Sequence, residues 1–278
     1  EMGRNVESTA EGILRIVNTR MEGAIRTISL ERGYDPRYFT LVAYGGAGPM
    51  HACSLAEELG IPKVLVPPDP GVLSAVGIAM SDVVKDYSRT LLVHQDHLAS
   101  ESVKSVFQSL EEQGRGELLE DGFSGRRIRL RRFLDMRYVG QSYEITIECP
   151  NLNQNLARSA IRRFHRVHKQ RYGHSDWRQP VELVTVRLKA IGLVEKPDFE
   201  KLEEIEGSGS SGLKDQRSVT FDGNIELTSC YERSLLKPGQ RLDGPALVFQ
   251  MDSTTVIPPG WKVKVDGWRN LIAERMSG

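Results

Sequence analysis

The segment FTLVAYGGAGP, at residues 39–49, decides the fold of the first part of this sequence. Its apolar run, residues 39–44, has the length and composition of a buried strand and ends in a glycine-rich turn, residues 45–48. Pro49 then opens an apolar helical pattern that Gly60 closes, since proline suits the first position of a helix and glycine suits its end. The segment therefore predicts a strand, a glycine turn and a helix in succession.

The glycine turn has a composition that suits a ligand as well as a tight bend. Glycine allows positive φ, and it lets a ligand approach the backbone without a Cβ in the way. The helix that follows presents unpaired N–H groups and the positive end of its dipole, which favour phosphate or another anion. The spacing is neither that of a Walker loop nor that of a dinucleotide fingerprint. The residues alone leave open a structural turn and a nucleotide site formed by Gly45, Gly46, Ala47 and Gly48.

Helices and strands alternate on both sides of this turn. Before it, apolar residues recur at helical spacing at Leu14, Val17, Met21, Ile25 and Ile28. We expect this helix to begin with a capping box formed by Ser8 and Glu11 and to stop at Gly33. After the turn, residues 63–66 predict a buried strand and residues 72–80 a helix. Such alternation indicates α/β layers.

The rest of the sequence predicts an α+β region and then short strands. Helical patterns occur around residues 103–110, where Gly114 and Gly116 weaken them, and over residues 156–172, while residues 127–148 predict paired strands and residues 184–190 a half-buried strand. Gly207–Gly212 is rich in Gly and Ser, which is typical of a flexible linker or loop. We therefore expect four segments: an α/β part at 1–93, an α+β part at 94–206, a linker or loop at 207–214 and a small β-rich module at 215–278.

Composition excludes several classes of protein. Lys and Arg together number 37 and so do Asp and Glu, so the formal net charge is zero, which argues against a nucleic-acid or membrane-surface binder. No apolar run reaches the roughly 18 residues that indicate a membrane span. The three widely spaced cysteines favour reduced thiols in the cytoplasm over a disulfide framework.

Two residues outside the turn are further candidates for catalysis. His51 lies near the start of the helix after the turn, where the dipole favours its neutral form, although a capping or packing role is the simpler interpretation. Asp86 follows the helix at 72–80 and stands four residues after Asp82, a spacing at which two carboxylates can bind Mg²⁺ or act in acid–base chemistry. A solvated helix end is the more common explanation. For the three histidines at 165, 168 and 174 we expect packing, and we predict no metal site.

Several motifs in one order resemble the hydantoinase A/5-oxoprolinase family. They are ERGYDPR (31–37), LVAYGGAGPMHA (41–52), LGIP (59–62), PGVLSAVG (70–77) and DYSRT (86–90), followed near the C-terminus by GPA (244–246), DSTT (252–255) and PPGW (258–261). The resemblance spans nearly the whole chain and is weakest over about residues 95–215. Motifs of this length in a fixed order are more specific than a single glycine turn.

The resemblance implies a subunit of an ATP-dependent enzyme. Family members hydrolyse cyclic amides such as N-methylhydantoin or 5-oxoproline, and relatives carboxylate ketones such as acetone or acetophenone. The implied nucleotide domain is similar to the actin/Hsp70/sugar-kinase fold, with Gly45, Gly46, Ala47 and Gly48 cradling the adenosine part of ATP. We therefore expect a partial actin/Hsp70/sugar-kinase-like domain followed by an α+β region and the β-rich module.

One part of that fold has no counterpart in the sequence. Its phosphate-handling half carries an Asp-x-Gly-Gly-Thr-like loop, and no such segment occurs here. We expect the chain to be the C-terminal portion of a family member and to be inactive alone. ATP phosphates, Mg²⁺ and much of the substrate chemistry would then depend on a preceding segment or on a second hydantoinase-type subunit. A ketone carboxylase subunit and a non-catalytic assembly module are the alternatives.

Overall fold

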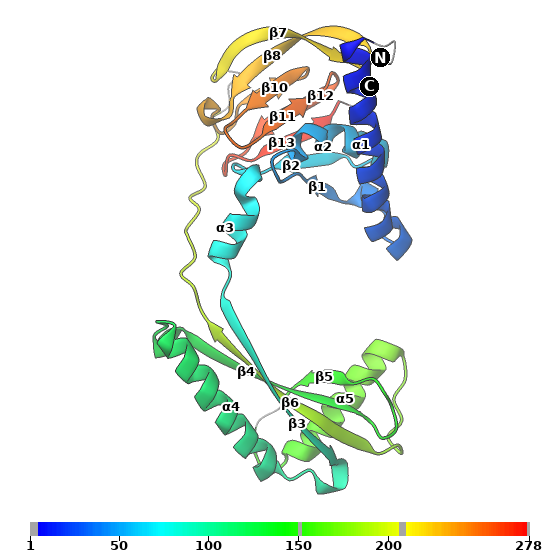
Figure 1. Ribbon diagram of the computed structural model, residues 1–278, viewed down its shortest axis with the longest axis vertical. Helices are drawn as coiled ribbons and strands as arrows, with labels where there is room; N and C mark the ends of the chain where they lie inside the picture. Colours follow the sequence, from blue (N-terminus) through cyan, green and yellow to red (C-terminus); the bar gives the residue numbers. More distant parts are fainter. Residues whose placement is uncertain (1–4, 150–151, 206–209, 277–278) are drawn as a thin grey trace. The chain divides into compact units, whose positions relative to one another are not determined.

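The structure is a computed structural model that describes residues 5–149, 152–205 and 210–276 (Figure 1). It divides into two compact units, of which one comprises Glu1–Ala79 with Pro197–Gly278 and the other Met80–Lys196. Each unit has a hydrophobic core of its own. The first and last parts of the chain therefore fold together.

Helix α1 (Val6–Ile28) opens the first unit. The expected capping box is wrong, because the N-cap is Asn5, whose Oδ1 accepts a hydrogen bond from Ser8 N at 2.8 Å. Asparagine caps a helix as well as serine does, and here it stands three residues earlier in the chain. The Glu11 carboxylate instead accepts from Gly223 N at 2.8 Å. After α1 a short 3-10 helix, Leu30–Arg32, ends at Gly33 in the left-handed conformation.

Two sheets complete the first unit (Figure 1). One has the order β1-β2-β13-β12-β9, formed by Thr40–Val42, Lys63–Val66, Leu271–Arg275, Trp261–Val265 and Arg241–Asp243. The other has the order β11-β10-β8-β7, formed by Thr254–Ile257, Ala246–Phe249, Asn224–Glu232 and Leu213–Phe221. The β-rich module expected at residues 215–278 therefore contributes strands to both sheets.

The core of this unit joins early and late segments. Helix α2 (Gly48–Leu59) connects the parallel strands β1 and β2, and helix α3 (Leu73–Met80) follows them. The small residues Ala52 and Ala56 of α2 share one core with Val64 of β2, Val248 of β10 and Trp261 of β12. Small side chains let the helix approach the strands closely, and burial of the larger ones stabilises the assembly.

The second unit is an antiparallel sheet with two helices. Its strand order is β3-β6-β4-β5, formed by Val83–His94, Val181–Gly192, Ile128–Tyr138 and Ile145–Glu148. Helices α4 (Ser100–Glu120) and α5 (Leu156–Tyr172) contribute Phe107 and Phe164 to its core. The sequence did not predict β3, because charged residues interrupt its apolar pattern. The expected mixture of α/β and α+β structure is confirmed.

Part of the predicted linker lies outside the described residues. The structure describes Ser210 onward, and β7 begins at Leu213. The glycines predicted to weaken the helix around residues 103–110 lie inside α4, which continues through both of them.

Candidate functional site

The glycine turn lies at the carboxyl end of β1, where the chain enters α2. Gly45 has φ 84°, a conformation that favours glycine, and its N–H donates to Pro70 O at 2.7 Å. A Cβ on Gly45 would meet no described atom within 4 Å, so open space borders the backbone there. Within this sheet β1 and β2 pair in parallel and the other described pairs are antiparallel. The turn lies at the carboxyl end of this parallel pair, the edge beyond which ligands of parallel α/β sheets bind.

The start of α2 is suited to an anion. Its N-cap is Ala47, which has no side-chain oxygen to accept hydrogen bonds from the first turn of the helix. Ala47 is exposed, and the next two residues are Gly48 and Pro49. Gly48 N donates to Gly45 O at 3.2 Å, Met50 N donates to Ala47 O at 3.1 Å, and Pro49 has no N–H. The helix dipole is therefore the feature of this end that favours a negatively charged ligand.

Asp252 packs against the glycine turn from a distant part of the sequence. It lies in the loop between β10 and β11, and its Oδ2 accepts from Gly71 N at 2.7 Å. A Cβ on Gly71 would lie 2.5 Å from that oxygen, and a Cβ on Gly46 would lie 3.2 Å from Asp252 O. Close packing thus requires glycine at Gly71, Gly46 is tightly packed, and Gly45 borders open space. Sequence reasoning did not connect Asp252 with the turn, because only the tertiary structure brings the two together.

His51 packs α2 against α1. Its Nδ1 lies 2.7 Å from Asn18 Oδ1, and its ring is buried. Burial lowers the pKa of His51 and so favours its neutral form. The structure therefore gives His51 a packing contact, and its catalytic role stays a prediction.

Asp86 belongs to the second unit, whereas the glycine turn belongs to the first. It lies on β3 with an exposed side chain 3.7 Å from Lys189 Nζ. Asp82 accepts from Val194 N and from Lys196 Nζ, and the Lys196 bond is the main cause that lowers its pKa. The expected solvated helix end is wrong here. Asp86 lies on β3 and pairs with Lys189 of β6, and Asp82 lies just before β3 and pairs with the segment after β6.

His165 and His168 of α5 belong to an aromatic cluster that His174 joins from beyond the helix. His165 Nδ1 lies 3.0 Å from the Tyr138 hydroxyl, and its ring stacks on Trp177 at 4.0 Å. His168 Nδ1 lies 2.7 Å from His174 O. Within the described ranges no group of three or more His, Cys, Asp or Glu residues is placed to hold a metal ion.

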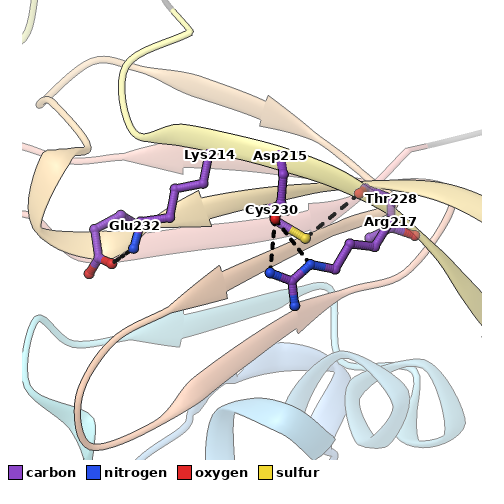
Figure 2. Close-up of polar contacts among 6 residues, drawn as sticks. All are labelled: Lys214, Asp215, Arg217, Thr228, Cys230 and Glu232. Atoms are coloured by element: carbon purple, nitrogen blue, oxygen red, sulfur yellow. Dashed lines mark hydrogen bonds and ion pairs between the residues drawn. The ribbon is translucent and has the colours of Figure 1, made fainter.

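The cysteines are not placed as nucleophiles. Burial raises the pKa of the Cys53 thiol to about 12, far above neutral pH. Figure 2 shows Cys230 on β8 beside Asp215 and Arg217 of β7, with its thiol donating to Thr228 O at 3.8 Å. Burial and the Asp215 carboxylate raise the pKa of Cys230.

None of the helices in the described part of the chain is long and apolar enough to cross a membrane.

Comparison with known proteins gives the family. The hydantoinase/oxoprolinase model matches residues 1–87, and the hydantoinase/oxoprolinase C-terminal domain model matches residues 93–275. The class that the fold defines is a mixed α/β protein related to actin-like ATPases, as the sequence predicted. The chain belongs to the hydantoinase/oxoprolinase family.

Three known proteins are similar to this chain in sequence or structure. An uncharacterized protein of Methanocaldococcus jannaschii is 39% identical over 99% of this chain and 39% of its own length. Caprolactamase subunit alpha of Pseudomonas jessenii is 34% identical over 95% of this chain and 39% of its own length. The crystal structure of the ATP-dependent caprolactamase from that organism gives a TM-score of 0.66 at 32% identity, over 99% of this chain and 41% of the matched chain. A nucleotide-free acetone carboxylase structure gives a TM-score of 0.91 at 23% identity, over 99% of this chain and 41% of the matched chain. The chain spans about two fifths of the length of these relatives.

Proposed function

We propose that this chain is the C-terminal portion of an ATP-dependent hydrolase subunit that opens cyclic amides. The glycine turn, residues 45–48, would contribute to the site for the adenosine part of ATP. The observation that supports this proposal is the structure at the carboxyl end of β1. There Gly45 has a positive φ and its backbone borders open space, and Ala47 leaves the start of α2 without a side-chain cap. Both features fit a nucleotide.

The relatives support the proposed substrate class. Caprolactam is a cyclic amide, and an ATP-dependent caprolactamase is 32% identical to this chain. The likeness to acetone carboxylase, at 23% identity, supports the shared fold alone, so ketone carboxylation is the second candidate. Turnover assays of the complete protein with a lactam, and with acetone and bicarbonate, separate the two reactions.

The remaining parts of the reaction would come from outside these residues. ATP phosphates are normally bound together with Mg²⁺, and we propose that a preceding segment holds both. A second hydantoinase-type subunit is the proposed partner, because the caprolactamase relative is itself a subunit alpha. The reduced thiols of this chain are in keeping with a cytoplasmic location.

The turn can be tested by placing a negative charge on it. Ala47→Asp supplies a carboxylate at an exposed N-cap, so the fold should keep or gain stability while repulsion weakens ATP binding by roughly tenfold or more. Ala47→Asn is the matched control, because it offers a similar cap without the charge and should bind ATP more tightly than the Asp variant. Calorimetry on the complete protein measures both affinities. Equal ATP affinity in wild type and Ala47→Asp would remove the turn from the nucleotide site, and an absence of ATP binding in the wild type would favour the assembly module.

Gly46→Val is a weaker test of the same site. Its Cβ would press on Asp252 O at 3.2 Å, so a loss of binding would report on packing as well as on the ligand. A separate control is the 278-residue chain alone, for which we expect no ATP turnover. Measurable turnover would show that the phosphate site lies within these residues.

A further inference from the structure

The two edges of the five-stranded sheet in the first unit differ in chemistry. β9 forms one edge, and its residues Arg241 and Asp243 are charged and exposed. β1 forms the other edge, and its residues Thr40, Leu41 and Val42 carry no charge. Edge strands of folded proteins are normally protected from further pairing by charged side chains, by proline, by bulges or by a covering element. The side chains of β9 give such protection, and those of β1 do not.

Both edges of the four-stranded sheet in the same unit are protected. β7 forms one of them and carries Lys214, Asp215 and Arg217, whose ion pairs are drawn in Figure 2. β11 forms the other, and although it is uncharged, its Thr255 and Ile257 are buried and α2 packs against it. Among the described strands of this unit, β1 is therefore the edge that lacks charged residues and stays largely exposed.

The side chains in and beside β1 are apolar and exposed. The sequence predicted a buried strand over residues 39–44, yet Phe39, Val42 and Tyr44 are 53%, 47% and 57% exposed. Ala43 does lie in the core of the unit, so the strand is covered on one face. The described residues therefore supply only part of the burial that the composition of this strand predicts.

The backbone of β1 offers hydrogen bonds to a further strand. Ala43 N donates to Leu65 O of β2 at 2.8 Å. Successive residues of a strand direct their N–H and C=O groups to opposite sides, so those of Val42 point to the open edge. A strand added at this edge would pair with them, as in other cases where a chain extends an exposed sheet edge.

Helix α1 exposes a second apolar surface in the same unit. None of its residues is buried, and all of them are described. It contacts the unit through one face, where Asn18 Oδ1 lies 2.7 Å from His51 Nδ1 and Ile25 packs on the core. Another face carries apolar residues at helical spacing, which we call the α1 stripe: Val6, Ala10, Ile13, Val17, Met21, Ala24 and Ile28. Met21 is half-buried and the other members are exposed.

We propose that the open edge of β1 and the α1 stripe are docking surfaces for another part of the same polypeptide. A strand of that part would pair with β1, and an apolar surface of it would pack on the stripe. This chain covers 39% of the length of its Methanocaldococcus jannaschii and caprolactamase relatives, so more than half of each relative lies outside the match. The proposal rests on the part of the proposed function that makes this chain a portion of a longer polypeptide, and it is independent of ATP and of the substrate.

A second copy of this chain is the less suitable occupant. β1 has only three residues, so pairing between two β1 strands would give few hydrogen bonds and bury little area. Such pairing would also leave the α1 stripe without a cover of its own. A larger part of the same polypeptide can supply a strand and an apolar surface together.

Amide hydrogen exchange in the complete polypeptide tests the edge of β1. The matched control is Arg241 on β9, because Val265 N donates to Gln240 O at 2.9 Å and the Arg241 N–H therefore points to the free edge. After correction for intrinsic rates, we expect the Val42 amide to exchange roughly tenfold or more slowly than the Arg241 amide. Equal exchange at the two positions would overturn the proposal.

Thiol labelling of the complete polypeptide tests the α1 stripe. Ile13→Cys places a thiol on the stripe, and Leu227→Cys places one on β8, where the native side chains are 58% and 63% exposed. A maleimide should label Ile13→Cys roughly tenfold or more slowly, because the stripe is covered in the complete polypeptide. Equal labelling of the two variants contradicts a covered stripe. The exchange measurement needs no substitution, so it decides the proposal if a variant does not fold.

Both measurements use the complete polypeptide alone and are repeated on dilution. Protection that falls with dilution assigns the surfaces to a second copy, and protection that appears only when a second subunit is added assigns them to that subunit. Either result overturns the proposal. Protection that is independent of concentration supports it.

The outcome is distinguishable from a failure of the proposed nucleotide site. Ala47→Asp tests the glycine turn with ATP, whereas exchange at Val42 is measured without a ligand. A protected Val42 in a polypeptide that does not bind ATP refutes the nucleotide site and leaves the docking surfaces standing. Fast exchange at Val42 with ATP binding retained refutes the docking surfaces alone.

Discussion

Asp252 shows how one residue can hold two glycine-bearing loops together. Its Oδ2 accepts from Gly71 N at 2.7 Å, its backbone oxygen lies against Gly46, and its Oδ1 accepts from Gln250 at 2.6 Å. The DSTT motif and the glycine turn are separated by about two hundred residues, yet they form one piece of structure. At this scale the glycines differ in what they do. Gly46 and Gly71 make room for Asp252, and Gly45 supplies the positive φ.

Gly71→Ala tests this packing. The new Cβ would lie 2.5 Å from Asp252 Oδ2, so the carboxylate must move and its hydrogen bond is lost. We expect the free energy of unfolding to fall by about 1–3 kcal/mol, measured by denaturant titration. In an Asp252→Gly background the same substitution should cost less, because the clashing atoms are gone. Additive effects of the two substitutions would contradict the contact.

At the scale of elements, helix α4 packs against the sheet of the second unit through a glycine. A Cβ on Gly114 would lie 2.9 Å from Ala190 Cβ of β6 and 3.0 Å from the Tyr87 ring of β3. The sequence predicted that Gly114 and Gly116 weaken this helix, because glycine has a low helix propensity. In the structure the tertiary contact at Gly114 outweighs that propensity. Gly116, two residues on, meets no described atom within 4 Å. Close packing therefore explains the glycine at position 114 but not the glycine at position 116.

A pair of matched variants separates these reasons. Gly116→Ala should stabilise the protein by about 0.5–1 kcal/mol, because alanine favours the helix and nothing obstructs it. Gly114→Ala gains the same propensity but must displace Ala190 or Tyr87, so we expect a net loss of about 1–3 kcal/mol. Thermal and denaturant unfolding measure both variants. A similar stabilisation by both would show that α4 and β6 do not approach as closely as described.

At the scale of the whole molecule, the chain is discontinuous in one unit and continuous in the other. Met80–Lys196 lies between two segments that fold together, and it contains its own core around Phe107, Leu134 and Phe164. The four strands of this unit pair only with one another among the described residues. A continuous segment with a complete sheet and a separate core meets the requirements for folding alone.

Excision of residues 80–196 tests that independence. We expect the excised segment to unfold cooperatively and to give dispersed amide signals in NMR spectra, because its core does not depend on the rest of the chain. The matched control is residues 1–79 alone, in which β2 lacks its partner β13, and this segment should not fold. A disordered 80–196 segment would show that its core needs contacts outside those residues.

Local patterns in the sequence predict much of this structure, including the glycine turn itself. Helix α5 begins and ends where its apolar period does, and α2 begins within a residue of Pro49, because side-chain period and capping are local properties. The capping box at Ser8 failed because a competing cap, Asn5, lies nearby. The strand β3 was missed because its charged residues pair across strands, as Asp86 does with Lys189, rather than alternate with apolar ones.

The sequence by itself determined the motifs that resemble the family, the strand, glycine turn and helix of residues 39–60, and the alternation of helices and strands around that turn. Only the tertiary structure decided that residues 197–278 fold with residues 1–79, that Asp252 lies on the glycine turn, and that β1 lies at an edge of its sheet. The physical reason is that strand pairing and close packing join residues far apart in the chain. β13 pairs with β2 across about two hundred residues, and no local period records that contact.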